Sequence, residues 1–338
     1  MKGPFRPERI LVIRADRLGD VLMNLPAIRL LRQTFPKAWI SLLLDESTAE
    51  LFEGHPDVDE VIGVNAGRLE ASLFEKWRLI RRIRKAGFDM AIVSNPHKFF
   101  HVLSFLAGIS ERVGYDRKWG FLLNRKREKA GKNGARHEID VNLELVGLVS
   151  DKRWDGGFSL PADEAADRFV EEWFKSCCGG SERVLAVHPG TSNPRKRWGL
   201  ECFAELCRNV LKKRGIPVVL VGGGEERGLA QALMKGAGEG VLDLTGKLTL
   251  RQLSSFLKHP RVAALVSADS GPVHVAWING TPVVALYAKD VEGCDPARWG
   301  PRDSKSEVIY RPIGEITVQE VCEAVQRVVV KSPLPPLK

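Results

Sequence analysis

Four segments of the chain place charged or hydroxyl side chains, together with glycine or proline, directly after a hydrophobic run. They cover residues 14–31, 188–203, 219–233 and 267–287. In parallel α/β proteins such runs are strands, and ligands bind beyond the carboxyl ends of those strands. The four segments are therefore where we expect chemistry or ligand binding.

The first segment, RADRLGDVLMNLPAIRLL, carries a candidate general base. A strand ends here, a tight turn containing Gly19 follows, and Asp20 begins an amphipathic helix. A carboxylate with an ordinary pKa is ionised at neutral pH and can accept a proton. The alternative is a helix cap, the usual role of aspartate at such a position, which stabilises a helix by about 1 kcal/mol.

The second segment, HPGTSNPRKRWGLECF, carries candidate ligands for a diphosphate. Thr191 and Ser192 follow the strand, and the cations Arg195, Lys196 and Arg197 come next. Hydroxyl groups and clustered cations suit a diphosphate because they neutralise its oxygens. The alternative is a solvated surface loop.

The third segment, VLVGGGEERGLAQAL, combines a glycine triplet with acidic residues. Glycines after a strand allow a ligand to approach the backbone closely. Glu225 or Glu226 can then accept hydrogen bonds from a ribose. The triplet differs from the GxGxxG pattern of dinucleotide enzymes, and a tight turn without a ligand explains it equally well.

The fourth segment, SADSGPVHVAWINGTPVVALY, predicts a helix N-terminus that can hold a phosphate. A strand ends in Asp269, Ser270 and Gly271, and Pro272 then opens a helix. Free N–H groups and the helix dipole favour an anion there. His274 lies on the first turn, where it can face a ligand or pack in the core.

Short β-branched runs that alternate with helical stretches must position these segments. This alternation predicts an α/β fold of two doubly wound, Rossmann-type domains that face a central cleft. The predicted strands cover residues 9–15, 39–46, 60–64, 88–94, 183–190, 217–224, 262–269 and 282–288. The predicted helices of the first half lie at about 19–34, 47–54 and 70–86.

Glycine and proline punctuate a helix within residues 150–182, which predicts the domain boundary there. We expect domains of residues 1–165 and 166–338, with the last helix packing back on the first domain. The six cysteines show neither a CxxC pair nor zinc-site spacing, and no metal is predicted.

The composition is that of a soluble globular protein, with 44% hydrophobic and 28% charged residues in 338. The apolar run 10–13 is too short for an export signal, and no stretch approaches the roughly 20 apolar residues that span a bilayer. We therefore expect a cytoplasmic protein. Its net charge of +9 suits nucleic acid, an anionic membrane or a phosphorylated substrate.

Two basic segments of the first half bear on that choice. Segment 72–85 has Leu73, Phe74, Trp77, Ile80 and Ile83 near one helical face, which favours a sheet-covering helix over a membrane-surface helix. The second segment, 117–132, has seven basic residues and one acidic residue. It is too basic for a buried element and suits the phosphates of lipid A or an anionic inner-membrane face.

Together these segments resemble the ADP-heptose:lipopolysaccharide heptosyltransferase family, glycosyltransferase family 9. The matching features are the GD turn followed by Leu25-Pro26, the HPG…KRW loop, the GG…E turn and DSGPVH…A…GTPVVALY. Residues 243–257 and 296–301 also fit the family pattern. The features occur in family order from about residue 8 to 330.

The resemblance implies a GT-B architecture with an N-terminal acceptor domain and a C-terminal nucleotide-sugar domain. It implies an inverting transfer of L-glycero-D-manno-heptose from ADP-heptose to Kdo-lipid A or heptosyl-Kdo-lipid A, without a metal. By position, Asp20 matches the catalytic base and Lys196 the lysine that holds the donor phosphates, with Thr191 and Ser192 beside it. The remaining donor-site matches are Glu225 (or Glu226) at the ribose, and Asp269, Ser270, Gly271 and His274 at the sugar and diphosphate.

Three alternatives remain open at this stage. One is a family member with another donor, such as UDP-N-acetylglucosamine, and another is a GT-B-shaped sugar-nucleotide epimerase. The third is a basic nucleic-acid-binding protein, but no helix-turn-helix, zinc or interleaved aromatic pattern supports it, so we expect no specific nucleic acid. His97, in the loop after the fourth predicted strand, can contact an acceptor or lie in a plain surface loop.

Overall fold

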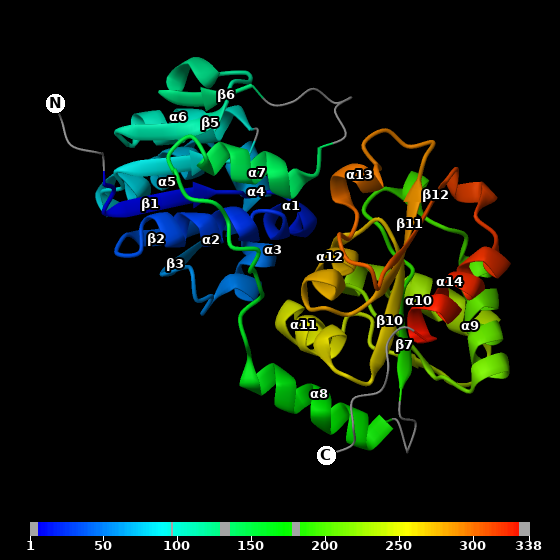
Figure 1. The fold of residues 1–338 in the computed structure, drawn as a ribbon. Helices are drawn as coiled ribbons and strands as arrows, with labels where there is room; N and C mark the ends of the chain where they lie inside the picture. The colour runs from blue at the N-terminus through cyan, green and yellow to red at the C-terminus, as the bar shows by residue number, and fades with distance from the viewer. Residues whose placement is uncertain (1–5, 96, 129–135, 178–182, 331–338) are drawn as a thin grey trace. The chain divides into compact units, whose positions relative to one another are not determined.

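The computed structural model describes residues 6–95, 97–128, 136–177 and 183–330. The chain divides into two compact units, Met1–Ala162 and Asp163–Lys338. This division falls within the predicted boundary region, of which residues 178–182 lie outside the described residues. Each unit holds one parallel six-stranded sheet flanked by helices (Figure 1).

The sheet of the first unit has the strand order β3-β2-β1-β4-β5-β6, which is the Rossmann-type order. Its strands are β1 (Arg9–Ile13), β2 (Trp39–Asp45), β3 (Glu60–Val64), β4 (Met90–Val93), β5 (Glu111–Tyr115) and β6 (Arg125–Arg127). Its helices are α1 (Leu18–Leu22), α2 (Leu25–Thr34), α3 (Glu46–Ala49), α4 (Ala66–Ala71), α5 (Leu73–Ala86), α6 (Lys98–Leu106) and α7 (Glu138–Val146), with short 3-10 turns η1 (Glu50–Phe52) and η2 (Gly120–Leu122).

The second unit repeats the same winding, with the strand order β12-β11-β10-β7-β8-β9. Its strands are β7 (Val184–His188), β8 (Val218–Leu220), β9 (Val241–Asp243), β10 (Val262–Ala268), β11 (Val283–Ala288) and β12 (Glu307–Arg311). Its helices are α8 (Glu164–Cys177), α9 (Leu200–Arg214), α10 (Arg227–Ala237), α11 (Leu250–Lys258), α12 (Gly271–Ile278), α13 (Pro296–Trp299) and α14 (Val318–Val330), with 3-10 turns η3 (Pro194–Lys196), η4 (Gly224–Glu226) and η5 (Ile313–Glu315).

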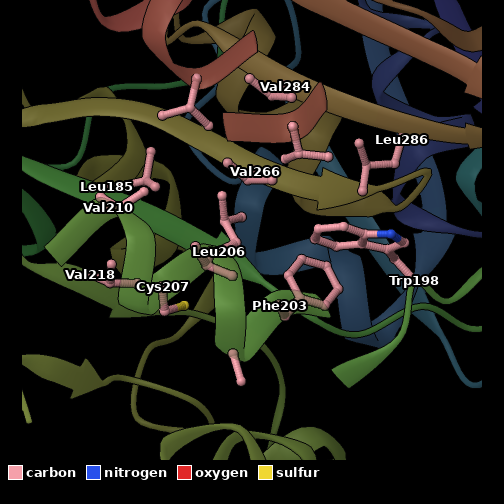
Figure 2. Packing of buried hydrophobic residues seen from close by; sticks show 14 of the residues in the cluster. Leu185, Trp198, Phe203, Leu206, Cys207, Val210, Val218, Val266, Val284 and Leu286 are labelled. Carbon is pink, nitrogen blue, oxygen red and sulfur yellow. The ribbon is translucent and has the colours of Figure 1, made fainter. Parts of the chain in front are cut away.

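The core of the second unit explains why its strands are hydrophobic along their whole length. Every residue of β7, β10 and β11 is buried, because helices cover both faces of the sheet. On one face of the sheet, α9, α10 and α14 pack on the strands around Trp198 and Phe203 (Figure 2). The rings of these two residues are arranged edge to face, with their centroids 4.9 Å apart. Helix α14 packs on β10, β11, β12 and α9 of its own unit, and its packing on the first domain stays a prediction.

Two expectations about local structure are corrected. The helix predicted over 19–34 is split into α1 and α2, because Pro26 occupies the first turn of α2 and cannot continue a preceding helix. The strands β5, β6, β9 and β12 were not predicted from the sequence. They lie at or next to sheet edges, where short and charged strands such as the Arg-Lys-Arg of β6 are typical and leave little hydrophobic pattern.

Each sheet has one point at which the chain reverses its winding direction. In the first unit this point lies between β1 and β4, and in the second between β7 and β10. Open α/β sheets bind ligands at the carboxyl ends of the two strands that flank such a point. Three of the four predicted segments begin at these strand ends, and the third begins within the neighbouring strand β8 and continues past its end. Within the described ranges, no helix is both long and apolar enough to cross a membrane.

Candidate active site

In the first unit, a buried arginine joins the ends of β1 and β4. Arg14 is the first residue after β1, and only 2% of its surface is exposed. Its Nη2 donates to Asp20 Oδ1 at 2.5 Å, and its Nη1 donates to the backbone carbonyl of Ser94 at 2.8 Å. Since Ser94 directly follows β4, the guanidinium fixes Asp20 at the point where the sheet reverses its winding.

Two further carboxylates surround Arg14. Its Nε donates to Asp16 at 2.9 Å, and Glu138, which is fully buried at the start of α7, lies 3.6 Å from its Nη2. Burial by itself would lower the pKa of Arg14, but the three neighbouring carboxylates hold it above its ordinary value. Burial and the nearby charge of Asp20 raise the pKa of Asp16 to about 6, although Arg14 acts in the opposite direction.

The structure removes the helix-cap interpretation of Asp20. Helix α1 begins at Leu18 with Arg17 as its N-cap, and no side chain caps it. Asp20 lies within the first turn, and its side chain is 24% exposed. A carboxylate that is held by one oxygen and partly open to solvent is suited to accept a proton from a bound substrate.

In the second unit, an ion pair joins the loop after β7 to the end of β10. Lys196 Nζ lies 2.5 Å from Asp269 Oδ2, and the two side chains are only 15% and 9% exposed. The buried Trp198, whose Nε1 donates to the carbonyl of Ile316 at 2.9 Å, anchors the loop two residues beyond Lys196. The cation is therefore held at the winding reversal of the second sheet.

A buried histidine at the end of β7 organises the same region. His188 Nε2 lies 3.1 Å from Glu226 Oε2, and its Nδ1 lies 2.9 Å from Ser267 Oγ and 3.2 Å from Ser270 Oγ. A proton on Nε2 satisfies these contacts, because the ring then donates to the carboxylate and accepts from a serine hydroxyl. His188 thus links the third predicted segment to the fourth.

Of the two neighbouring glutamates, Glu226 is the one directed into this network. Burial would raise the pKa of Glu226, but hydrogen bonds from His188 and from the Gly223 N–H hold it below its ordinary value. A Cβ atom at Gly190 would overlap the Glu226 carboxylate, so a larger residue there would displace this side chain from His188. Glu225 is exposed.

The other predicted donor-site residues lie in the loop after β7 and at the start of α12, the two segments that the Lys196–Asp269 ion pair joins. Thr191 is buried, and its Oγ1 accepts a long hydrogen bond of 3.4 Å from the Asn193 N–H, whereas Ser192 is exposed. Ser270 is the N-cap of α12, and Gly271 is the first residue of that helix. The Ser270 hydroxyl does not cap the helix and instead contacts His188 and Ser267. His274 lies on the first turn of α12 and is buried, with 4% of its surface exposed.

Comparison with known proteins supplies the family. A sequence profile of glycosyltransferase family 9 (heptosyltransferase) matches residues 76–324. The chain belongs to glycosyltransferase family 9. Among its relatives is lipooligosaccharide heptosyltransferase 2 of Haemophilus ducreyi, which is 27% identical over 90% of this chain and 89% of that protein.

Solved structures of glycosyltransferases share the fold. The family 9 glycosyltransferase of Veillonella parvula is 22% identical, with a TM-score of 0.85 over 96% of this chain and 98% of that one. The Escherichia coli heptosyltransferase WaaC, solved with ADP-2-deoxy-2-fluoro heptose, is 21% identical, with a TM-score of 0.72 over 94% of this chain and 99% of that one. The two doubly wound sheets predicted from the sequence, and the GT-B-like class, are confirmed.

Membership of family 9 makes the chain a glycosyltransferase and decides between the enzyme classes considered above. The epimerase and nucleic-acid alternatives are set aside. In the described part of the chain, no three His, Cys, Asp or Glu side chains form a group that could hold a metal ion.

Three residues that organise the two sites, Arg14, His188 and Glu138, are not among those predicted from the sequence. The position of Arg14 could have predicted its role, because a charged residue directly after a buried strand lies at the carboxyl end of that strand. His188 was read only as part of a loop motif, although it too ends a strand. Glu138 gave no signal, since its burial beside Arg14 depends on how α7 packs.

Proposed function

We propose that this family 9 enzyme transfers L-glycero-D-manno-heptose from ADP-heptose to the inner core of lipopolysaccharide, at Kdo or the first heptose. One observation carries the proposal: a partly exposed carboxylate, Asp20, lies where the first sheet reverses its winding, and a half-buried Lys196–Asp269 pair lies at the corresponding point of the second sheet. Relatives named as heptosyltransferases support the sugar. The Escherichia coli enzyme solved with an ADP-heptose analogue supports the donor.

The proposed reaction is a single displacement with inversion. The acceptor hydroxyl oxygen bonds to the anomeric carbon while the bond from that carbon to the β-phosphate oxygen breaks. The hydroxyl proton moves to the Asp20 carboxylate, and ADP leaves with the bonding electrons. The base and the groups that stabilise the leaving diphosphate must act on opposite sides of the anomeric carbon.

The contacts of Asp20 suit the role of base. Its Oδ1 accepts from Arg14, and within the described residues no hydrogen bond is made by Oδ2. We therefore assign the proton to Oδ2. The rigid guanidinium holds the carboxylate in one rotamer, so that little reorganisation is required at the moment of transfer.

The donor side supplies positive charge without a metal in this proposal. Lys196 and the free N–H groups at the start of α12 would neutralise charge that develops on the departing ADP. Asp269 keeps the ammonium group of Lys196 at the end of β10. Glu226, held by His188, is our candidate for the ribose hydroxyls, in place of Glu225. Thr191, Ser192 and His274 keep their proposed place in the donor site because they match the positions of donor-site residues in the family motifs.

The test is ADP release from ADP-heptose by the full chain, with and without a Kdo-terminated lipid A acceptor and with and without EDTA. We expect release that depends on the acceptor and is unchanged by EDTA. Calorimetry with ADP and with UDP runs in parallel. Tight ADP binding without turnover would support ADP-heptose as the donor and show that this acceptor is not the substrate. Preferential UDP binding would support the UDP-sugar alternative. The proposed reaction takes place in the cytoplasm.

A further inference from the structure

The N-terminal half of α5 carries large apolar side chains that are not in the core. Leu73 is 82% exposed, Phe74 70% and Trp77 53%, whereas Leu79, Ile80 and Ile83 are buried. The expectation that the apolar residues of this segment share one sheet-covering face is therefore wrong for its first half. Only the second half of α5 covers the sheet.

A second pair of aromatic side chains protrudes from the loop around η2. Trp119 is 46% exposed and Phe121 71%, and their rings stack with centroids 5.9 Å apart. Lys118, which precedes this pair, has a φ of 53°. A lysine seldom adopts this left-handed conformation, and such strain is typical of functional segments.

These two groups lie on neighbouring elements of the first unit. Helix α5 packs on α6, and α6 packs on η2. The ammonium group of Lys76 lies 5.9 Å from the ring of Phe99 on α6. Burial lowers the pKa of His97 at the start of α6, and the positive charges of Lys118, Lys76 and Lys98 add to that effect, whereas the Glu70 carboxylate opposes it. Cations from α5, α6 and the η2 loop therefore meet near one residue and outnumber the single carboxylate there.

Exposed cations flank the apolar side chains. Arg81 and Lys85 continue the helical row of Trp77 at i+4 spacing, and Arg117 and Lys118 precede Trp119. All four are exposed, and within the described residues they form no ion pair. The segment from 117 on was predicted to be an exposed basic surface, of which residues 129–132 lie outside the described residues.

We infer that this aromatic–basic surface docks the first unit on an anionic lipid bilayer. We define it by its five apolar and four basic side chains: Leu73, Phe74, Trp77, Trp119, Phe121, Arg81, Lys85, Arg117 and Lys118. The apolar side chains enter the headgroup region, and the cations pair with lipid phosphates. A bilayer fits better than a protein partner, because exposed apolar side chains from two elements are flanked by cations that, in the described part of the chain, form no ion pair and complement anionic headgroups.

The surface adjoins the edge of the sheet that carries Asp20. His97 caps α6 three residues after Ser94, whose carbonyl accepts from Arg14. Helices that follow strands begin at the carboxyl edge of the sheet, and Asp20 lies at the same edge. Docking by this surface would hold the first unit where a bilayer-anchored acceptor reaches its base. The docking itself does not depend on the proposed reaction.

The test is cosedimentation of the full chain with vesicles of phosphatidylcholine alone or of phosphatidylcholine and phosphatidylglycerol in equal parts. Neither donor nor acceptor is present, so the result is independent of the enzymatic assignment. We expect binding to the anionic vesicles that exceeds binding to the neutral vesicles and weakens at high salt. The combined variant Phe74→Ser, Trp77→Ser, Phe121→Ser should reduce partitioning by at least about tenfold.

Two further variants make the result specific. The variant Arg81→Gln, Lys85→Gln, Arg117→Gln should remove the preference for anionic lipid. The control Phe169→Ser, Tyr310→Ser changes residues of the second unit that are 37% and 41% exposed, and it should bind like the wild type. Circular dichroism confirms that each variant is folded. Equal binding to both vesicle types, unchanged binding by the serine variant, or no binding at all would overturn the inference. Self-association that the serine variant abolishes would identify a protein partner instead.

Discussion

Arg14 Nη2 donates to Asp20 Oδ1 at 2.5 Å while Nη1 of the same guanidinium donates to the Ser94 carbonyl at 2.8 Å. The planar fork thus ties the side chain of the candidate base to the backbone at the end of a neighbouring strand. Lysine carries the same charge but cannot present two donors in a fixed plane. The orientation of Asp20, and not only its charge, therefore depends on arginine at this position.

Arg14→Lys is expected to lower kcat by about 100-fold, because a misplaced base no longer meets the acceptor hydroxyl. ADP affinity should remain near the wild-type value, since ADP is assigned to the second unit. Steady-state kinetics and calorimetry measure the two quantities. Arg17→Lys is the matched control, because Arg17 is exposed and adjacent in sequence. A loss of ADP affinity equal to the loss of kcat would contradict a positioning role.

Asp20→Asn should reduce transfer by about 100- to 10,000-fold while leaving ADP binding intact, as expected when a general base is removed. Asparagine keeps the shape of the side chain and can still accept from Arg14, so the fold should be preserved. Acceptor-dependent ADP release is the measurement. Near-normal transfer by this variant would assign the base to another group.

Asp16→Asn should stabilise the protein at neutral pH. The pKa of Asp16 is raised from 3.8 to about 6, so the folded chain holds this proton more tightly than the unfolded chain. The contribution of Asp16 to the free energy of unfolding therefore falls as pH rises from 3.8 to about 6, and it does not recover above that range. The variant should gain about 1–3 kcal/mol in the free energy of unfolding at neutral pH.

Urea unfolding of wild type and Asp16→Asn across that pH range measures this effect. The two curves should converge on the acidic side, where the wild-type carboxyl is protonated. A difference that is the same at every pH would point to packing instead of titration.

Lys196→Gln should weaken ADP binding by about 10- to 100-fold, the usual effect of losing a charge-assisted hydrogen bond to phosphate. It should also lower Tm, because Asp269, with 9% of its side chain exposed, loses its cation. Calorimetry and thermal unfolding report the two effects. Lys212→Gln changes an exposed cation on α9 of the same unit and should alter neither. Equal effects of both substitutions would indicate a general electrostatic role.

Glu226→Gln should weaken ADP binding more than Glu225→Gln does. Glu226 is held by His188 and by the Gly223 N–H, whereas Glu225 is exposed. A donor-site role at Glu225 would produce the opposite ranking. The neighbouring glutamates have the same side chain but differ in burial and contacts, so each variant is the control for the other.

The hydrophobic pattern of the sequence was enough to predict the alternating strands and helices and the residues at the strand ends. Buried parallel strands such as β7 and β10 are apolar along their whole length, and glycine or proline marks where they end. The edge strand β6, with three exposed basic residues, has no such pattern. The protrusion of Phe74 and Trp77 was equally hidden, because helical spacing does not show where the underlying sheet stops.

The sequence by itself therefore determined the fold class and the segments at which chemistry is expected, since both follow from local periodicity and turn residues. Only the tertiary structure decided which charged groups meet. Arg14 reaches the carbonyl of Ser94 across 80 residues, and Lys196 reaches Asp269 across 73. Strand order brings these partners together, and strand order depends on long-range packing that no local pattern encodes.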